Sequence, residues 1–119
     1  MTGRAERLRI YVRESDRWEG EPLAGQIVRR ARAAGLAGAT VVRGFEGFGA
    51  DGRVHAATLL ETEADLPLIV EIVDAKEKIA PFLPELERMV SQGLVTLEEV
   101  RVVADGHPSR PDGGAAGSG

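Results

Sequence analysis

One short run of the sequence, LPLIVEIV at residues 66–73, constrains the fold more than any other part of the chain. Aliphatic and β-branched residues in a run of this length indicate a strand, and Pro67 fits only near its start. Side chains of a strand alternate between two faces, and both faces of this strand are largely apolar. Both faces must therefore be covered. We expect helices of the same chain to cover one face and another subunit to cover the other.

Three more strands and two helices are predicted around this run. The alternating pattern of residues 8–13 indicates a half-buried strand, and two apolar runs indicate the others. Apolar residues at helical spacing indicate the helices, of which the first ends at Gly35. Asp74 and Glu77 are typical of a capping box at the start of the second helix, and two prolines must break or kink it. The remaining ranges are 40–43 and 94–103 for the strands, and 23–34 and 75–92 for the helices.

The order of these elements is strand, helix, strand, strand, helix, strand. We therefore predict an α+β protein with a ferredoxin-like βαββαβ fold. The helices of this single domain should pack on one face of a four-stranded antiparallel sheet. We expect the domain to span residues 7–104, between a flexible N-terminus at residues 1–6 and a disordered Gly-rich tail at residues 105–119.

The composition excludes several functional classes. The 119 residues include no Cys and two His, so disulfides and thiolate zinc sites are excluded. We therefore expect no metal site and no required cofactor. The formal net charge of −4 argues against nucleic acid as a partner. No apolar run approaches the roughly 18 residues of a spanning helix, and no secretory signal is evident, so we expect a cytoplasmic protein.

Few residues outside the core suggest chemistry. No Ser or Thr stands in a nucleophile motif, so we expect no catalytic residue of that kind. The connection at residues 45–65 is long enough to indicate a functional loop. His55 lies in it as a surface residue or a ligand contact. Glu71 interrupts the apolar strand, so it needs either a ligand or an arginine partner on a neighbouring strand, for which Arg9, Arg13 and Arg101 are candidates.

Four stretches of the chain, in order, resemble the PII-like branch of the PII signal-transduction superfamily. They are ESDRWEGEPL (14–23), GATVVRGFEGFG (38–49), DLPLIVEIVD (65–74) and GLVTLEEV (93–100). The resemblance implies a homotrimer that binds a small effector, an adenine nucleotide, in clefts between subunits. It also implies a regulatory protein rather than an enzyme, which signals through the loop 45–65 to a target such as a membrane transporter or an enzyme.

The resemblance also indicates which residues form the site. Gly47, Phe48 and Gly49 match a Gly-Phe-Gly motif at the end of the second strand, and Glu71 matches a glutamate near the nucleotide cleft. The full set expected to bind the ligand is Gly38, Thr40, Arg43, Gly44, Gly47, Phe48, Gly49, Glu71 and Arg101. The set expected in the effector loop is Phe45, Glu46, Asp51, Gly52, Arg53 and His55.

The chain departs from typical PII proteins in the connection before its last strand. Typical members have a phosphate-holding Gly-Asp-Gly-Lys loop there, whereas this chain has only Ser91-Gln92-Gly93 and no Lys. This departure argues against triphosphate binding of the typical kind and leaves a nucleoside monophosphate, another small molecule or no ligand. Two other hypotheses stay open: a small enzyme that uses His55 and Glu71, and a ligand-free structural trimer.

Overall fold

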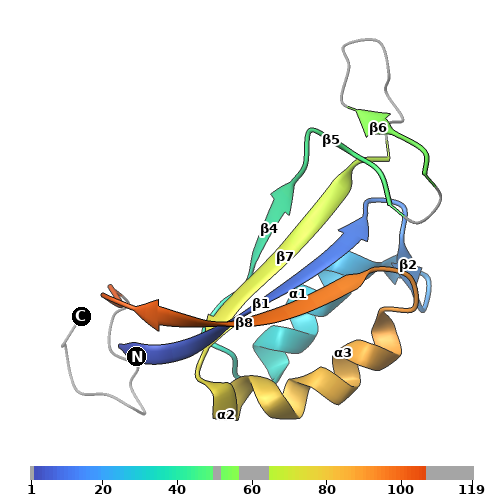
Figure 1. The fold of residues 1–119 in the computed structure, drawn as a ribbon. Helices are drawn as coiled ribbons and strands as arrows, with labels where there is room; N and C mark the ends of the chain where they lie inside the picture. The colour runs from blue at the N-terminus through green and yellow to red at the C-terminus, as the bar shows by residue number, and fades with distance from the viewer. Residues whose placement is uncertain (1, 50–51, 57–64, 107–119) are drawn as a thin grey trace.

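The computed structural model describes residues 2–49, 52–56 and 65–106, and it consists of one sheet with helices against it (Figure 1). Four strands form the main sheet, and two short ribbons pair β2 with β3 and β5 with β6. The strands are β1 (Gly3–Arg13), β2 (Arg17–Trp18), β3 (Glu21–Pro22), β4 (Thr40–Arg43), β5 (Glu46–Gly47), β6 (His55–Ala56), β7 (Pro67–Asp74) and β8 (Leu94–Val102). The helices are α1 (Leu23–Ala33), α2 (Lys76–Ile79), the 3-10 turn η1 (Ala80–Phe82) and α3 (Leu83–Met89).

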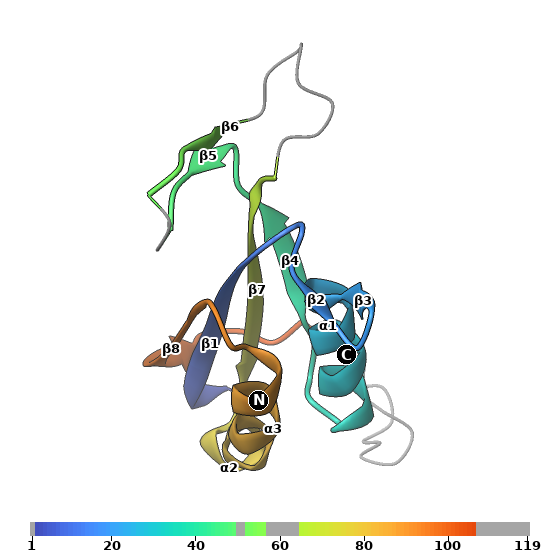
Figure 2. The same ribbon diagram turned by 90° about the vertical axis from the view of Figure 1, so that its right-hand side faces the viewer.

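The strand order in the main sheet is β4-β7-β1-β8, and every neighbouring pair is antiparallel. The first and third long strands of the chain therefore lie in the centre, and the second and fourth lie at the edges. This is the ferredoxin-like arrangement, so the predicted fold class is confirmed. Figure 2 shows α1, α2 and α3 on one side of the sheet and the β5–β6 ribbon projecting beyond its end.

Alternation along β1 explains how the core forms. Leu8 and Ile10 have no exposed surface, and the arginines between and beside them lie on the opposite face. The same face of β7 supplies Val70 and Ile72, and α1 supplies Ile27. β1 is longer than the alternating pattern indicated, because residues 3–6 pair with residues 99–102 of β8. Those residues were expected in a loose terminus. The tail beyond residue 106 lies outside the described residues.

The second helical segment is broken, as its two prolines required. The α-helical hydrogen bonding of α2 gives way to η1, whose N-terminal positions include Pro81, and α3 then continues to Met89. The predicted capping box is wrong, because Ala75 is the N-cap of α2 and no side chain caps it. The carboxylate of Asp74 instead accepts hydrogen bonds from the backbone N–H of Ala37 at 2.9 Å and of Ala75 at 2.7 Å. Asp74 therefore ties the end of β7 to the segment that precedes β4.

The face of the sheet opposite the helices carries both apolar and charged side chains. Its two ion pairs join neighbouring strands: Arg9 Nε lies 2.8 Å from Glu71 Oε2, and Arg7 pairs with Glu98. Its large apolar side chains are exposed or half-buried, and they include Tyr11, Val42, Ile69, Val73, Leu94, Val100 and Val102. No element of the described part of the chain packs over this open face. The apolar side chains on the second face of β7 are thus left uncovered by the described part of the chain.

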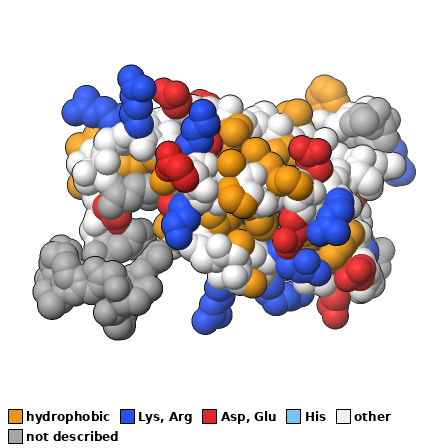
Figure 3. All heavy atoms as spheres, turned by 90° about the horizontal axis from the view of Figure 1, so that it is seen from below, with side chains coloured by type: hydrophobic (Ala, Val, Ile, Leu, Met, Phe, Trp, Pro, Cys, Tyr) orange, Lys and Arg blue, Asp and Glu red, His pale blue; other side chains and the backbone are white. Residues whose placement is uncertain are grey.

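The edge strand β8 extends beyond the cover of the helices. Its Val95 and Leu97 pair with Ile10 and Leu8 and so lie on the helical side, yet both are exposed. Seen from the side of α2 and α3, hydrophobic side chains gather in the middle of the surface and charged side chains surround them (Figure 3). Apolar surface therefore occurs on both sides of β8, as is common for a strand that another chain covers.

Candidate functional site

Two glycines position the start of the long connection against its end. The backbone N–H of Gly44 donates to the carbonyl oxygen of Pro67 at 2.7 Å. A Cβ atom at Gly44 would lie 2.6 Å from Pro67 Cγ, and one at Gly47 would lie 3.3 Å from the same atom. A side chain at Gly44 would therefore force Pro67 or the backbone to shift, whereas one at Gly47 would only make a tight contact. These glycines serve a close approach, and neither has a positive φ.

A polar cluster, which we call the loop clasp, holds both ends of the connection. One of its two carboxylates belongs to Glu14. Oε2 of Glu14 lies 2.8 Å from Arg43 Nη2, and Oε1 accepts a hydrogen bond from the backbone N–H of Leu66 at 3.2 Å. The N–H of Glu14 donates to the carbonyl oxygen of Leu66 at 3.0 Å. The next residue, Ser15, donates its N–H and its hydroxyl to the two carboxylate oxygens of Asp65, at 2.9 and 2.6 Å.

Sequence reasoning included only Arg43 of the five clasp residues in the site. Turn residues follow no hydrophobic period, so the pattern along the chain could not reveal that Glu14 and Asp65 meet. The only available signal was that both lie in stretches that carried the resemblance to the PII-like branch.

The structure brings Thr40 and Glu71 together as cross-strand partners on the open face. The expected arginine partner of Glu71 is confirmed, and it is Arg9 rather than Arg13 or Arg101. The hydrogen bond from Arg9 to Glu71 holds the pKa of the Arg9 guanidinium above its ordinary value. Glu71 is therefore an ion-paired carboxylate next to Thr40.

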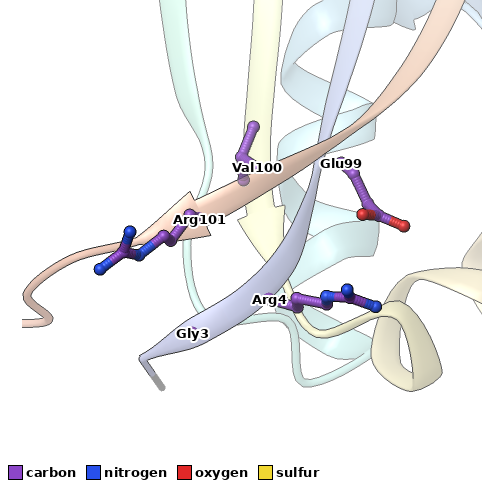
Figure 4. Close-up of a pocket in the computed structure, with 5 residues that line it drawn as sticks. All are labelled: Gly3, Arg4, Glu99, Val100 and Arg101. Carbon is purple, nitrogen blue, oxygen red and sulfur yellow. The ribbon is translucent and has the colours of Figure 1, made fainter.

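Arg101 lies far from the other expected ligand residues within one chain. It stands on β8, and two strands separate β8 from β4. Its cross-strand partner is Arg4, and the two arginines line a shallow hollow of about 350 Å³ with Gly3, Glu99 and Val100. Figure 4 shows the Arg101 side chain pointing away from Arg4 and Glu99. One chain alone therefore does not assemble the complete expected site.

Of the residues expected in the effector loop, Glu46 and His55 lie on the two strands of the β5–β6 ribbon, and Phe45, Gly52 and Arg53 lie beside them in sequence. Phe45, Phe48 and Val54 are strongly exposed, at 72%, 73% and 62% of their surface. Gly52 has a φ of 70° and donates its N–H to the carbonyl oxygen of Gly49 at 2.9 Å. The backbone of His55 pairs with Gly47 in the ribbon, whereas Asp51 lies outside the described residues. Glu46 and Arg53 are exposed.

Two further properties hold for the part of the chain that the structure describes. It contains no group of three or more His, Asp and Glu side chains that could hold a metal ion. None of its helices combines the length and the apolar character that crossing a membrane requires.

Solved structures with similar folds include a PII-like protein. A structure of CPII from Thiomonas intermedia K12, described as a nitrogen regulatory PII-like protein bound to ADP, AMP and bicarbonate, matches with a TM-score of 0.61 and 21% identity, over 83% of this chain and 88% of that chain. CPII bound to ADP and bicarbonate matches with a TM-score of 0.55 and 20% identity, over the same shares of the two chains. At this level of identity the likeness establishes the fold.

Sequence comparison identifies closer relatives. A UPF0166 protein of Aquifex aeolicus is 40% identical over 96 residues, which cover 81% of this chain and 90% of that protein. A UPF0166 protein of Methanocaldococcus jannaschii is 35% identical over 100 residues, which cover 83% of this chain and 92% of that protein. The family model of DUF190, described as "Uncharacterized ACR, COG1993", matches residues 5–102. The resemblance seen in the sequence is thus confirmed: the chain belongs to the DUF190 (UPF0166) family and has the fold of PII-like proteins.

Proposed function

We propose that this chain is a PII-like regulatory protein that binds an adenine nucleotide, as the resemblance in its sequence implied. The observation that carries the proposal is the likeness of the whole fold to CPII, which was solved with ADP and AMP bound. The described residues add a loop base in which glycines and an exposed arginine, Arg43, lie side by side. Glycine lets a ligand approach the backbone closely, and arginine suits phosphate oxygens.

A homotrimer is the proposed assembly, with the nucleotide in clefts between subunits. Arg43 and Arg101 lie near opposite edges of the sheet, on β4 and β8. One cleft can use both residues only if the β8 edge of one copy approaches the loop base of the next. The uncovered apolar side chains of the open face support such an association, because burial of apolar surface drives subunits together.

AMP and ADP are the proposed ligands in preference to ATP. The connection between α3 and β8 spans only residues 90–93, and it contains no lysine. Gly93 lies so close to β1 that a Cβ there would be 2.7 Å from the carbonyl oxygen of Tyr11. The connection is therefore packed against the sheet and lacks a cation for a third phosphate.

The proposed signal leaves the protein through the connection 45–65. The exposed aromatic rings of Phe45 and Phe48, on either side of β5, offer apolar contacts to a target protein. The expected target is a membrane transporter or an enzyme in the cytoplasm. A ligand can change such a contact only if it binds one state of the loop better than another. The ligand-free structural trimer is an outcome that the following experiment separates from this proposal.

The experiment is a thermal-shift and calorimetric titration with AMP, ADP and ATP, with GMP as the control for the base and light scattering for the assembly. A ligand that binds only the folded protein raises the melting temperature by mass action. We expect AMP and ADP to raise the melting temperature of a trimer more than ATP and GMP do. A protein that shows no shift with any adenine nucleotide at millimolar concentration, or that is a monomer, would contradict the proposal.

A further inference from the structure

The guanidinium of Arg43 already has an anionic partner, and that partner comes from the chain itself. Arg43 Nη2 lies 2.8 Å from Glu14 Oε2. The side chain of Arg43 is 63% exposed and that of Glu14 is 29% exposed. Arg43 is therefore open to an anion from solvent, while the Glu14 side chain that pairs with it is the more buried of the two.

Glu14 also holds the far end of the connection that begins after Arg43. Its second carboxylate oxygen accepts the N–H of Leu66, and its own N–H donates to the carbonyl oxygen of Leu66. The same carboxylate thus bridges a cation before the connection and the backbone after it. A change of partner at Arg43 therefore affects the hydrogen bond that Glu14 accepts from Leu66.

We propose that Glu14 is an internal occupant of an anion site at Arg43, and that a phosphate group of the effector binds Arg43 by displacing it. The inference rests on the proposed function only in taking Arg43 as a residue that contacts the ligand. Phosphate and carboxylate compete for the same planar set of guanidinium donors. Effector binding at Arg43 therefore weakens the hydrogen bond between the Glu14 carboxylate and the Leu66 N–H. A ligand shifts a loop in this way when it binds one state of the loop better than the other.

The strength of the ion pair suits such an exchange. An ion pair with one partner this exposed contributes little to the free energy of unfolding, because water and salt screen it. The rest of the loop clasp survives the loss of this single contact, since Ser15 still donates two hydrogen bonds to Asp65. Outside the clasp, the N–H of Gly44 still donates to the carbonyl oxygen of Pro67. Displacement of Glu14 loosens the end of the connection without unfolding the sheet.

The first test compares Glu14→Gln with Glu21→Gln by calorimetric titration with AMP and with inorganic pyrophosphate. Glutamine at position 14 keeps an acceptor for the Leu66 N–H but no longer competes for Arg43. We expect this variant to bind both probes about twofold to fivefold more tightly, because that factor corresponds to the free energy of an exposed ion pair. Glu21→Gln removes the same charge from the nearby exposed ribbon and should leave both affinities unchanged. Arg43→Gln should lose pyrophosphate binding.

The second test measures hydrogen exchange at the Leu66 amide. We expect faster exchange in ligand-free Glu14→Ala than in the wild-type chain, because the acceptor is gone. Saturating AMP should accelerate exchange at Leu66 in the wild type, and it should add nothing in Glu14→Ala. Slower exchange at Leu66 on AMP binding would overturn the proposal.

The outcomes separate this inference from the proposed function. If AMP binds but Glu14→Gln leaves the affinity unchanged or weakens it, the displacement of Glu14 is wrong and the nucleotide proposal stands. If pyrophosphate binds more tightly to Glu14→Gln but no adenine nucleotide binds preferentially, the anion site stands and the nucleotide proposal is wrong. If neither probe binds the wild type or Glu14→Gln, there is no anion site at Arg43.

Discussion

At the scale of single residues, the loop base depends on one close contact between Gly44 and Pro67. Replacement of Gly44 by Ala places a methyl group 2.6 Å from Pro67 Cγ and 3.2 Å from the Pro67 carbonyl oxygen. The backbone must shift and stretch the hydrogen bond from the Gly44 N–H. We expect Gly44→Ala to lower the free energy of unfolding by about 1–3 kcal/mol in chemical denaturation, as overpacking does.

The matched control for this change is Gly49→Ala. A Cβ at Gly49 would meet no atom within 4 Å, and its φ is not positive. Alanine there should leave the stability unchanged or raise it slightly, because it restricts the unfolded chain. Equal effects of the two substitutions would contradict the steric explanation.

Sequence reasoning worked for residues whose partners are set by periodicity and failed for residues whose partners are set by turns. Leu8, Val70 and Leu86 lie in runs whose apolar spacing predicted two strands and a helix, and all three are buried, because a regular apolar face packs against the core. Asp74 looked like a helix cap from its local neighbours, yet it bonds Ala37, 37 positions away. Partners this distant are fixed by the packing of the whole chain.

At the scale of elements, β1 lies between two strands and pairs with each through an arginine. Arg7 joins β8 through Glu98, with Arg7 Nε 2.9 Å from Glu98 Oε1. This hydrogen bond holds the pKa of Glu98 below its ordinary value. A carboxylate with a lower pKa in the folded state stabilises the fold above its unfolded pKa, and the contribution is lost as the pH falls through the folded pKa.

Glu98→Gln should therefore lower the denaturation midpoint at neutral pH, and the difference from wild type should shrink on acidification. The effect is expected to be small, because the pair is exposed. Urea denaturation across the acid range measures it, with Glu99→Gln on the same strand as the control. Glu99 forms no ion pair among the described residues. A difference that stays constant down to strongly acidic pH would show that the charge of Glu98 is not its cause.

The site also shows what element order can and cannot predict. Strand order follows from the βαββαβ sequence, so the pairing of Thr40 with Glu71 was within reach of the pattern. The contacts of Glu14 could not be predicted in this way, because Glu14 lies in the turn between β1 and β2. Arg43 and Leu66 lie at the two ends of the connection between β4 and β7, and they meet Glu14 only in the folded chain. The clasp therefore joins the β1–β2 turn, the end of β4 and the connection before β7, and no one segment forms it.

At the scale of the whole molecule, the uncovered face of the sheet has the largest consequence. β4 offers an internal comparison, because Val41 and Val42 are neighbours in sequence and similarly exposed, at 43% and 50%. Register with β7 places Val42 opposite Ile69 on the open face and Val41 opposite Val70 on the helical side. If the open face is the subunit interface, a charge at Val42 is buried in the trimer without a partner, whereas a charge at Val41 stays at the edge.

If the proposed trimer uses the open face, Val42→Glu is expected to yield a monomer in light scattering, since burial of an unpaired carboxylate is costly. Val41→Glu should remain trimeric, and far-ultraviolet circular dichroism should show that both variants are folded. Because the proposed cleft needs residues from two copies, AMP affinity should fall with the trimer in Val42→Glu and persist in Val41→Glu. A trimer that survives Val42→Glu would move the interface away from the open face, and AMP binding by a folded monomer would place the whole site within one chain.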